Sequence, residues 1–251
     1  MLIPRKTTSS TIKTASKTLI YGFHGAGKTT QAAYYQKRFG NGLILSLEGG
    51  LASLKDVDID YIKVSSWDGD HDPASEVYSF RGVCGFLATE DFRKLNYKWI
   101  CVDSLTELSD LCYAHFSGHP SVKNSKGEVN NFDLWDKYNT QLIGGMKFLR
   151  DLPMHVLATS LAKQEQDNNG KTHYWPAIKG QTPQKQIPGI FDYVFGLIRK
   201  TETSGEATKV SRWVVAEELN GWHGKARDPR RRILPFEQCD DITTLLERAN
   251  S

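Results

Sequence analysis

One eight-residue stretch constrains this chain more than any other part of its sequence. Residues 22–29 follow the pattern G-x-x-x-x-G-K-[ST], between a β-type run at 18–21 and a helix-like run at 30–35. Gly22, Gly25 and Gly27 allow the close backbone approach with which successive N–H groups face phosphates at a helix N-terminus. The stretch therefore predicts a strand, a phosphate-binding loop and a helix that bind a nucleoside triphosphate.

The residues of this loop have separate expected duties. In such loops the lysine, here Lys28, reaches the β- and γ-phosphates, and the hydroxyl of the next residue, Thr29, binds Mg²⁺. We therefore predict ATP and Mg²⁺ as cofactors. The nucleotide-binding residues predicted for the loop are Gly22, Gly25, Ala26, Gly27, Lys28, Thr29 and Thr30.

The composition is that of a folded chain without a membrane span. Of the 251 residues, 39% are hydrophobic, which is enough for one large α/β domain, and the net charge of +3 gives no strong global field. No apolar run approaches the roughly 20 residues that cross a bilayer, and the cysteines form no C-x-x-C pair, so we expect a reduced, cytoplasmic location and no membrane partner. Residues 1–17 are predicted to be a flexible basic arm, and residues 18–251 a single domain.

The remainder of the chain alternates between strand-like and helix-like segments. This alternation predicts an α/β fold in which a mostly parallel sheet is covered by helices on both faces. Two late runs flank a turn-like Thr-Ser-Gly-Glu sequence and predict an antiparallel C-terminal hairpin that extends the sheet. The expected strands are 42–47, 61–65, 99–103, 155–160, 193–199 and 210–216, and the expected helices are 74–95, 105–116, 132–152 and 242–249.

Two strands of the predicted sheet end in a carboxylate. Asp103 follows the apolar run Trp-Ile-Cys-Val, and in this place it is expected to hold the water shell of Mg²⁺, although an N-cap for the helix from Leu105 is the structural alternative. Glu48 follows the strand at 42–47, where it is expected to orient or deprotonate the attacking water. A solvated loop residue is the alternative for Glu48.

The order of these features along the chain resembles that of the RecA-type recombinase core. The features are the glycine loop, the two acidic strand ends, a strand that ends in Thr159-Ser160, and the late hairpin. The chain is most similar to small phage-encoded RecA-like ATPases of the single-strand annealing or recombination type. The resemblance implies ATP binding between neighbouring subunits of a ring or filament, single-stranded DNA on the inner loops and, for a phage protein, the host cytoplasm. It extends over residues 18–236, and its most specific part is the glycine loop.

The resemblance also assigns roles to individual residues. It implies that Lys28 and Glu48 are catalytic, that Asp103 and Thr29 serve the metal, and that Thr159 and Ser160 sense the γ-phosphate. RecA has a glutamine at that last place, so this sequence departs from the pattern there. Lys225 and Arg227 resemble the paired basic residues that reach the neighbouring subunit's nucleotide, where a cation stabilises transition-state charge only after assembly.

Two long segments are predicted to hold single-stranded DNA. Residues 117–131 and 162–187 are long enough for functional loops, and the second combines aromatic residues with lysines, as base stacking and phosphate contact require. A packing role for the aromatic pair is the alternative. The predicted DNA-binding residues are Lys123, Lys126, Lys163, Lys171, Tyr174, Trp175, Lys179 and Lys185.

Other functions remain open at the level of sequence. A small-molecule kinase has the same glycine loop, but its usual Arg-rich lid has no counterpart after the fourth strand. A nucleotide-dependent assembly or loading protein without recombination activity fits the sequence equally well. A single-strand-binding protein is a further expected partner.

Overall fold

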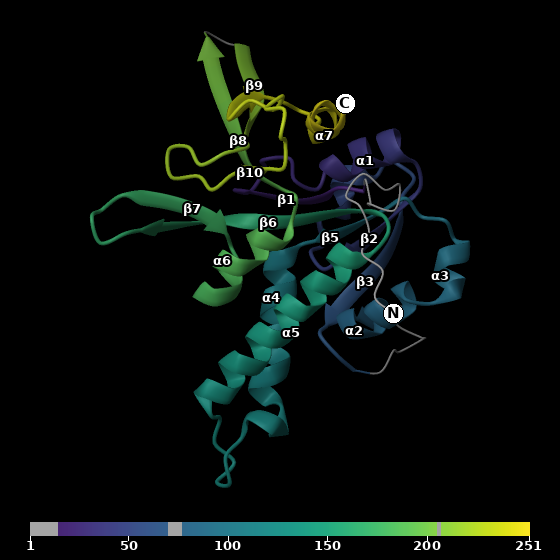
Figure 1. The fold of residues 1–251 in the computed structure, drawn as a ribbon, viewed down its shortest axis with the longest axis vertical. Coiled ribbons are helices and arrows are strands. Elements are labelled where there is room, and N and C mark those ends of the chain that lie inside the picture. The colour runs from purple at the N-terminus through teal and green to yellow at the C-terminus, as the bar shows by residue number, and fades with distance from the viewer. Residues whose placement is uncertain (1–14, 70–76, 205–206) are drawn as a thin grey trace, which may run out of the picture.

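Strand β1 (Lys17–Gly22) is the buried centre of the sheet in this computed structural model, which describes residues 15–69, 77–204 and 207–251. It pairs in parallel with β6 (His155–Gln166) on one side and with β8 (Tyr193–Ser204) on the other. Beyond β6 the parallel sheet continues through β5 (Trp99–Asp103), β2 (Gly42–Ser46), β3 (Asp60–Ser66) and β4 (Val77–Ser79) (Figure 1). The carboxyl ends of β1, β2, β5 and β6 therefore meet at one edge of the sheet.

The remaining strands are antiparallel. Strand β9 (Ala207–Val215) forms a hairpin with β8, and β11 (Phe236–Gln238) pairs with β9. Strand β10 (Lys225–Ala226) pairs with the start of β8, and β7 (Thr172–Pro176) pairs with the outer half of β6. The predicted fold class, a mostly parallel α/β sheet with an antiparallel C-terminal hairpin, is confirmed.

Each face of the sheet buries its own core, because successive strand residues point to opposite faces. Leu19 and Tyr21 of β1 belong to the core under α2 (Phe80–Leu87), α4 (Leu105–Gly118) and α5 (Asn131–Asp151). Ile20 belongs to the core under α1 (Gln31–Phe39) and α7 (Ile242–Asn250). Among the helices in the described residues, none is both long and apolar enough to cross a membrane.

The expected continuous helix at 74–95 is wrong. Strand β4 comes first, α2 follows, and a separate helix α3 (Glu90–Lys94) begins after a break. Ser79 caps α2 by accepting a hydrogen bond from the N–H of Gly82, and Thr89 caps α3 by accepting one from Phe92. These two N-caps divide a stretch whose apolar spacing resembles one helix. Residues 74–76 of the expected helix lie outside the described residues.

The two segments predicted as DNA loops have different structures. Strand β6 continues to Gln166 and turns at Asp167–Gly170 into β7, and helix α6 (Gln181–Ile190) follows, so 162–187 is largely regular structure. Residues 117–131 include the end of α4 and the start of α5, and between these helices lie a short 3₁₀ helix η2 (Pro120–Val122) and an antiparallel bridge between Lys123 and Val129. They lie at the far tip of that helix pair, well away from the β6–β7 hairpin (Figure 1).

His155, at the first position of β6, gives the fold a measurable pH dependence. Its ring stacks on Phe39 with 4.0 Å between centroids, and its Nδ1 accepts a hydrogen bond from the N–H of Ser16. Burial, and secondarily the charge of Lys17, lowers the pKa of His155 to about 4. Between about pH 6.5 and 4 the unfolded chain therefore binds a proton that the folded chain does not, and stability falls as the pH falls.

We expect His155→Gln to reduce this loss of stability. Between pH 7 and pH 5 the free energy of unfolding should decrease by about 1 kcal/mol less than in the unsubstituted protein, after allowance for the partial exposure of the ring. Urea unfolding at the two pH values measures the difference. His119→Gln, at an exposed position, is the control, and equal pH dependence in both variants would contradict the role of His155.

Candidate nucleotide-binding site

The glycine loop joins β1 to α1 in a conformation that needs its glycines. Gly25 and Gly27 have φ of 73° and 88°, the left-handed region that residues with a Cβ rarely adopt. Gly22 is close to its neighbour strand, because a Cβ on it would lie 2.5 Å from the carbonyl oxygen of Leu197. Ala26 is buried beneath the loop, which leaves the backbone at the surface of the site.

Lys28 is buried within the loop, with 8% of its surface exposed. Its Nζ donates to the carbonyl oxygens of Gly22 at 3.0 Å and Phe23 at 3.2 Å. Burial lowers the pKa of Lys28, while the carboxylates of Glu48 and Asp103 act in the opposite direction. The negative charge of a phosphate beside Nζ would add to the effect of these two carboxylates and favour the ammonium form.

Asp103, at the end of β5, joins the loop to two strands. Its Oδ2 accepts a 2.9 Å hydrogen bond from the Thr29 hydroxyl, and its Oδ1 accepts one from the hydroxyl of Thr159, which lies within β6, seven residues before its end. Burial raises the pKa of Asp103, and the two hydroxyl donors partly offset that rise. Both predicted metal residues, Thr29 and Asp103, therefore lie at one point.

These two oxygen ligands fit Mg²⁺, which is held by one or two protein groups together with phosphates and water. No group of three or more His, Cys, Asp or Glu side chains among the described residues forms a complete protein cage. Thr29 and Asp103 would therefore fit a metal ion whose other ligands are phosphate and water.

Glu48 lies beside Asp103 because the ends of β2 and β5 are tied together. The Asp103 carbonyl accepts hydrogen bonds from the N–H groups of Leu47 at 2.7 Å and Glu48 at 3.1 Å, and the Asp103–Ser104 peptide is cis. The Glu48 carboxylate accepts a hydrogen bond from the Ser104 hydroxyl. On α4, burial and then the charge of Glu48 raise the pKa of Glu107. A second acid near Glu48 was not predicted from the sequence.

Thr159 and Ser160 are both buried but serve different partners. Thr159 contacts Asp103, whereas the Ser160 hydroxyl lies 3.1 Å from that of Thr106 on α4. Neighbouring strand residues face opposite sides, which separates the two hydroxyls. Of the pair, Thr159 is in direct contact with the carboxylate of Asp103.

A cavity of about 350 Å³ opens over the glycine loop. Gly25, Gly27, Lys28 and Glu48 line it, and so does Arg212 of β9. Arg212 was not predicted from the sequence, since it lies 184 positions after Lys28 and carries no motif. No sequence pattern marks Arg212 as a site residue, and on β9 it shares a face with the buried Val214.

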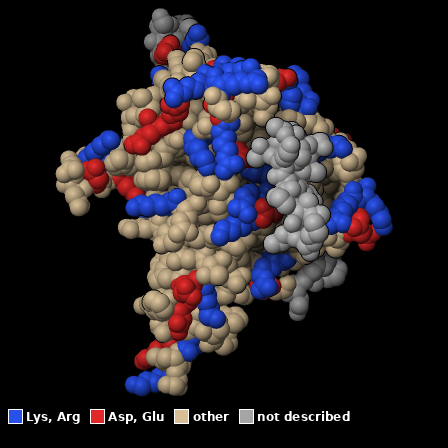
Figure 2. Space-filling model, in the orientation of Figure 1, with Lys and Arg blue, Asp and Glu red and all other residues tan. Residues whose placement is uncertain are grey.

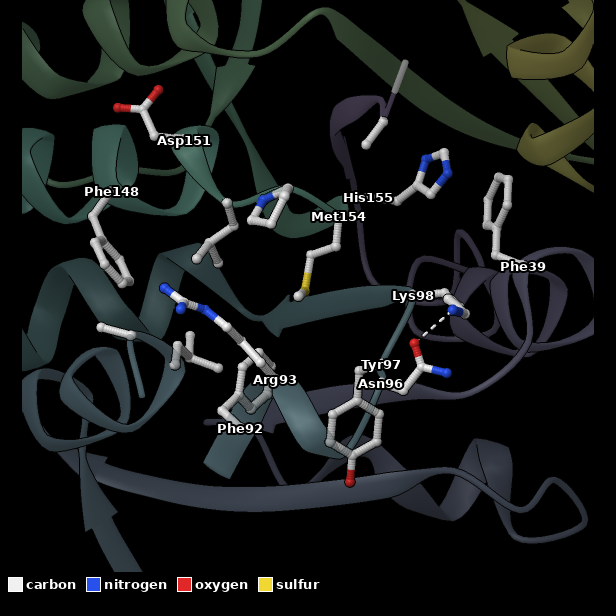
Figure 3. Close-up of a pocket in the computed structure, with 15 residues that line it drawn as sticks. Phe39, Phe92, Arg93, Asn96, Tyr97, Lys98, Phe148, Asp151, Met154 and His155 are labelled. Carbon is white, nitrogen blue, oxygen red and sulfur yellow. Dashed lines mark hydrogen bonds between the residues drawn. The ribbon is translucent and has the colours of Figure 1, made fainter. Parts of the chain in front are cut away.

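A larger cavity of about 680 Å³ lies at the opposite edge of the sheet, near the amino ends of β5 and β6. Phe39, Phe92 and Met154 line it together with Arg93 and His155 (Figure 3). Ligands of open parallel sheets bind at the carboxyl ends of the strands, and no residue of the glycine loop reaches this cavity. We therefore assign the nucleotide to the smaller cavity.

Lys225 and Arg227 also lie toward the amino ends of the strands. Ala226 is level with Thr18 across β8, about four residues or roughly 13 Å before the glycine loop. Lys225 Nζ donates to the carbonyl oxygens of Gly189 and Phe191, and Arg227 forms a 2.9 Å ion pair with Asp192. Contact of these cations with a γ-phosphate would therefore require a nucleotide bound by another subunit.

The predicted DNA residues occupy two separate regions. Lys163 and Lys171 lie on the β6–β7 hairpin, Lys179 and Lys185 lie before and on α6, and Lys123 and Lys126 lie at the tip of α4–α5. The aromatic rings pack inside the subunit: Tyr174 stacks on Trp222 at 4.6 Å and Trp175 on His223 at 3.4 Å between centroids. These stacks favour the packing alternative for the two rings.

The sheet order, the glycine loop and the acidic strand ends define a P-loop nucleotide-binding protein. More specifically, the chain belongs to the AAA domain family, whose model matches residues 14–228.

No curated protein matches the chain by sequence. Among solved structures, a KaiC-like protein from Pyrococcus horikoshii OT3 is 16% identical with a TM-score of 0.46, over 87% of this chain and 82% of that one. The flagellar accessory protein FlaH from Methanocaldococcus jannaschii is 14% identical with a TM-score of 0.36, over 84% and 82%.

We expect Lys28→Ala to weaken ATP binding at least about tenfold, because a charge-assisted contact to phosphate is lost. The fold should persist, since only two loop carbonyls lose a donor. Equilibrium binding of a fluorescent ATP analogue and a thermal melt measure the two effects. Lys37→Ala, on the exposed side of α1, is the matched control, and equal affinity in both variants would refute the assigned role.

Substitutions of the two acids should separate their duties. Glu48→Gln should retain ATP affinity but reduce turnover by about 10²-fold, a typical contribution of a general base. Asp103→Asn should instead raise the Mg²⁺ concentration needed for half-maximal rate, because the metal loses an anionic ligand. Steady-state rates over a Mg²⁺ series measure both, and the same kinetic change in both variants would argue against separate duties.

Proposed function

We propose that this protein is an ATPase that acts on single-stranded DNA in recombination or annealing, with ATP bound where neighbouring subunits of an oligomer meet. One observation carries the proposal. Strand β6 holds Thr159 against Asp103 and continues without interruption into the hairpin that bears Lys163 and Lys171. The nucleotide site and a basic hairpin thus share one rigid element.

The chain's own residues support hydrolysis. Lys28 and the loop N–H groups hold the phosphates, and Thr29 and Asp103 hold Mg²⁺, which neutralises charge on the phosphates when bound. Glu48 stands at the same edge with its carboxylate oriented by Ser104, where it accepts a proton from an attacking water. The trans cations of the proposal are Lys225 and Arg227 of the neighbouring subunit.

Phosphate contacts carry the proposed DNA binding. Lys163 and Lys171 are exposed on the hairpin, although Lys163 also pairs with Glu165 at 2.8 Å. Lys179 is held by Asp110 at 2.9 Å, and Lys185 is exposed on α6. On the face shown in Figure 2, basic side chains gather toward the end with α7 and β9. We therefore propose the hairpin lysines as individual phosphate contacts.

The hairpin is also tied to the glycine loop through aromatic side chains. Phe23, 46% exposed within the loop, meets the rings of Tyr174 and Trp222 edge-on, each at 6.0 Å between centroids. The buried Tyr21 hydroxyl bonds to the carbonyls of Tyr174 and His223 and to the N–H of His223. Through these contacts, a displacement of the hairpin by bound DNA would reach the glycine loop, and this is the route that we propose for DNA-stimulated turnover.

We expect single-stranded DNA to raise the ATPase rate and the hairpin to provide the contact. Lys163→Ala combined with Lys171→Ala should reduce the slope of log affinity against log salt by up to about 1.4, or 0.7 for each lost phosphate contact. Fluorescence anisotropy with labelled oligo-dT over a salt series measures this slope.

Lys123→Ala combined with Lys126→Ala removes the same charge from the far tip of α4–α5 and is the matched comparison. If the salt slope decreases only in the variant with Lys123→Ala and Lys126→Ala, the DNA site lies at the tip of α4–α5 instead of on the hairpin. ATPase that single-stranded DNA does not stimulate, with no binding of oligo-dT, would remove the DNA part of the proposal and favour the assembly function.

A further inference from the structure

Two arginines of the C-terminal hairpin lie directly on the glycine loop of the same subunit. Arg199 of β8 and Arg212 of β9 are cross-strand partners, so their side chains share one face of the hairpin. A Cβ on Gly25 would lie 3.3 Å from Arg199 Nη1, and a Cβ on Gly27 would lie 2.7 Å from Arg212 Nε. The absence of side chains at both glycines therefore leaves room for these guanidinium groups.

Like charges in directly opposite positions destabilise a hairpin unless an anion lies between or beside them. The protein anion at this place is Asp240, whose Oδ1 is 3.3 Å from Arg212 Nη1. That pair is weak, because the two side chains are 36% and 54% exposed. The buried Nε of Arg212 has no hydrogen-bond partner among the described residues.

An unpaired buried N–H destabilises the structure, and a phosphate oxygen is an acceptor that would satisfy it. The position of Arg212 indicates which phosphates of the nucleotide it would contact. Lys28, Thr29, Asp103 and Glu48 together mark the γ-phosphate and metal end of the site. Arg212 lies instead over Gly27, on the side of Thr30 and the start of α1, where loop N–H groups hold the α- and β-phosphates.

We propose that Arg212, supported by Arg199, is a cation supplied by the same subunit to the α- and β-phosphates, and that it leaves Asp240 when a nucleotide binds. The proposal rests on the nucleotide site of the proposed function and deepens it. Asp240 is placed to report the exchange, since its carbonyl accepts a 2.8 Å hydrogen bond from Gln31, whose Oε1 accepts one from Ile242 at the start of α7. The glycine loop and helix α7 are thus both connected to the ion pair between Arg212 and Asp240.

The test measures equilibrium binding of N-methylanthraniloyl-labelled ADP and ATP with Mg²⁺ present. Arg212→Ala should weaken binding of both nucleotides by similar factors of about ten- to hundredfold, the range for a hydrogen bond to a charged group. Arg212→Lys, which keeps the charge but not the planar fork, should lose less. Asp240→Asn should tighten binding about two- to fivefold, because it removes a competing exposed ion pair.

Two controls keep the outcomes separate. Lys209→Ala removes a charge three residues along β9 on the opposite face, and it should bind as the unsubstituted protein does. If the unsubstituted protein binds nucleotide and Lys28→Ala does not, wild-type affinity in Arg212→Ala overturns the further inference alone. A loss confined to ATP overturns the α,β assignment, and Asp240→Asn without tighter binding overturns the exchange. If the unsubstituted protein binds neither nucleotide, the proposed function itself fails.

Discussion

The carboxylate of Asp103 is the contact on which the rest of the site depends. It accepts hydrogen bonds from Thr29 in the glycine loop and Thr159 within β6, while its backbone carbonyl accepts hydrogen bonds from Leu47 and Glu48, directly after β2. Because this group is 2% exposed, its charge is stabilised by those hydroxyls and by Lys28 instead of by water. Asp103 thereby holds the ends of β2 and β5 and Thr159 of β6 next to the phosphate-binding loop.

Much of the fold follows from local patterns in the sequence. Apolar runs such as Trp99–Asp103 can only be strands covered on both sides, and the glycine loop fixes where the first strand meets the first helix. The strand and two helices between 77 and 94 and the regular structure between 162 and 190 were not predicted correctly. The N-caps Ser79 and Thr89 compete with apolar periodicity, and the strand β7 is stabilised by rings 48 positions away in sequence.

The same distinction applies to the candidate site. Residues within one motif or at a strand end, such as Lys28, Thr29, Glu48 and Asp103, were named from the sequence, and they lie together in the structure. Arg212 and Arg199 were missed because their place depends on how a distant hairpin packs against the loop, which no local pattern encodes. In the opposite direction, a Tyr-Trp pair beside lysines suggests base stacking, but the partners Trp222 and His223 occupy those rings.

The phenol of Tyr21 limits how this protein can diverge. It is fully buried, with its oxygen in contact with two carbonyls and one N–H from segments some 150 and 200 residues later in the chain. Replacement by Phe would remove the contacts of the hydroxyl with all three backbone groups, which destabilises more than the loss of one ordinary hydrogen bond. A substitution at residue 21 would therefore affect both the β6–β7 hairpin and the loop around His223. Grafting the β6–β7 hairpin onto another sheet would therefore require a tyrosine at the position of residue 21 as well.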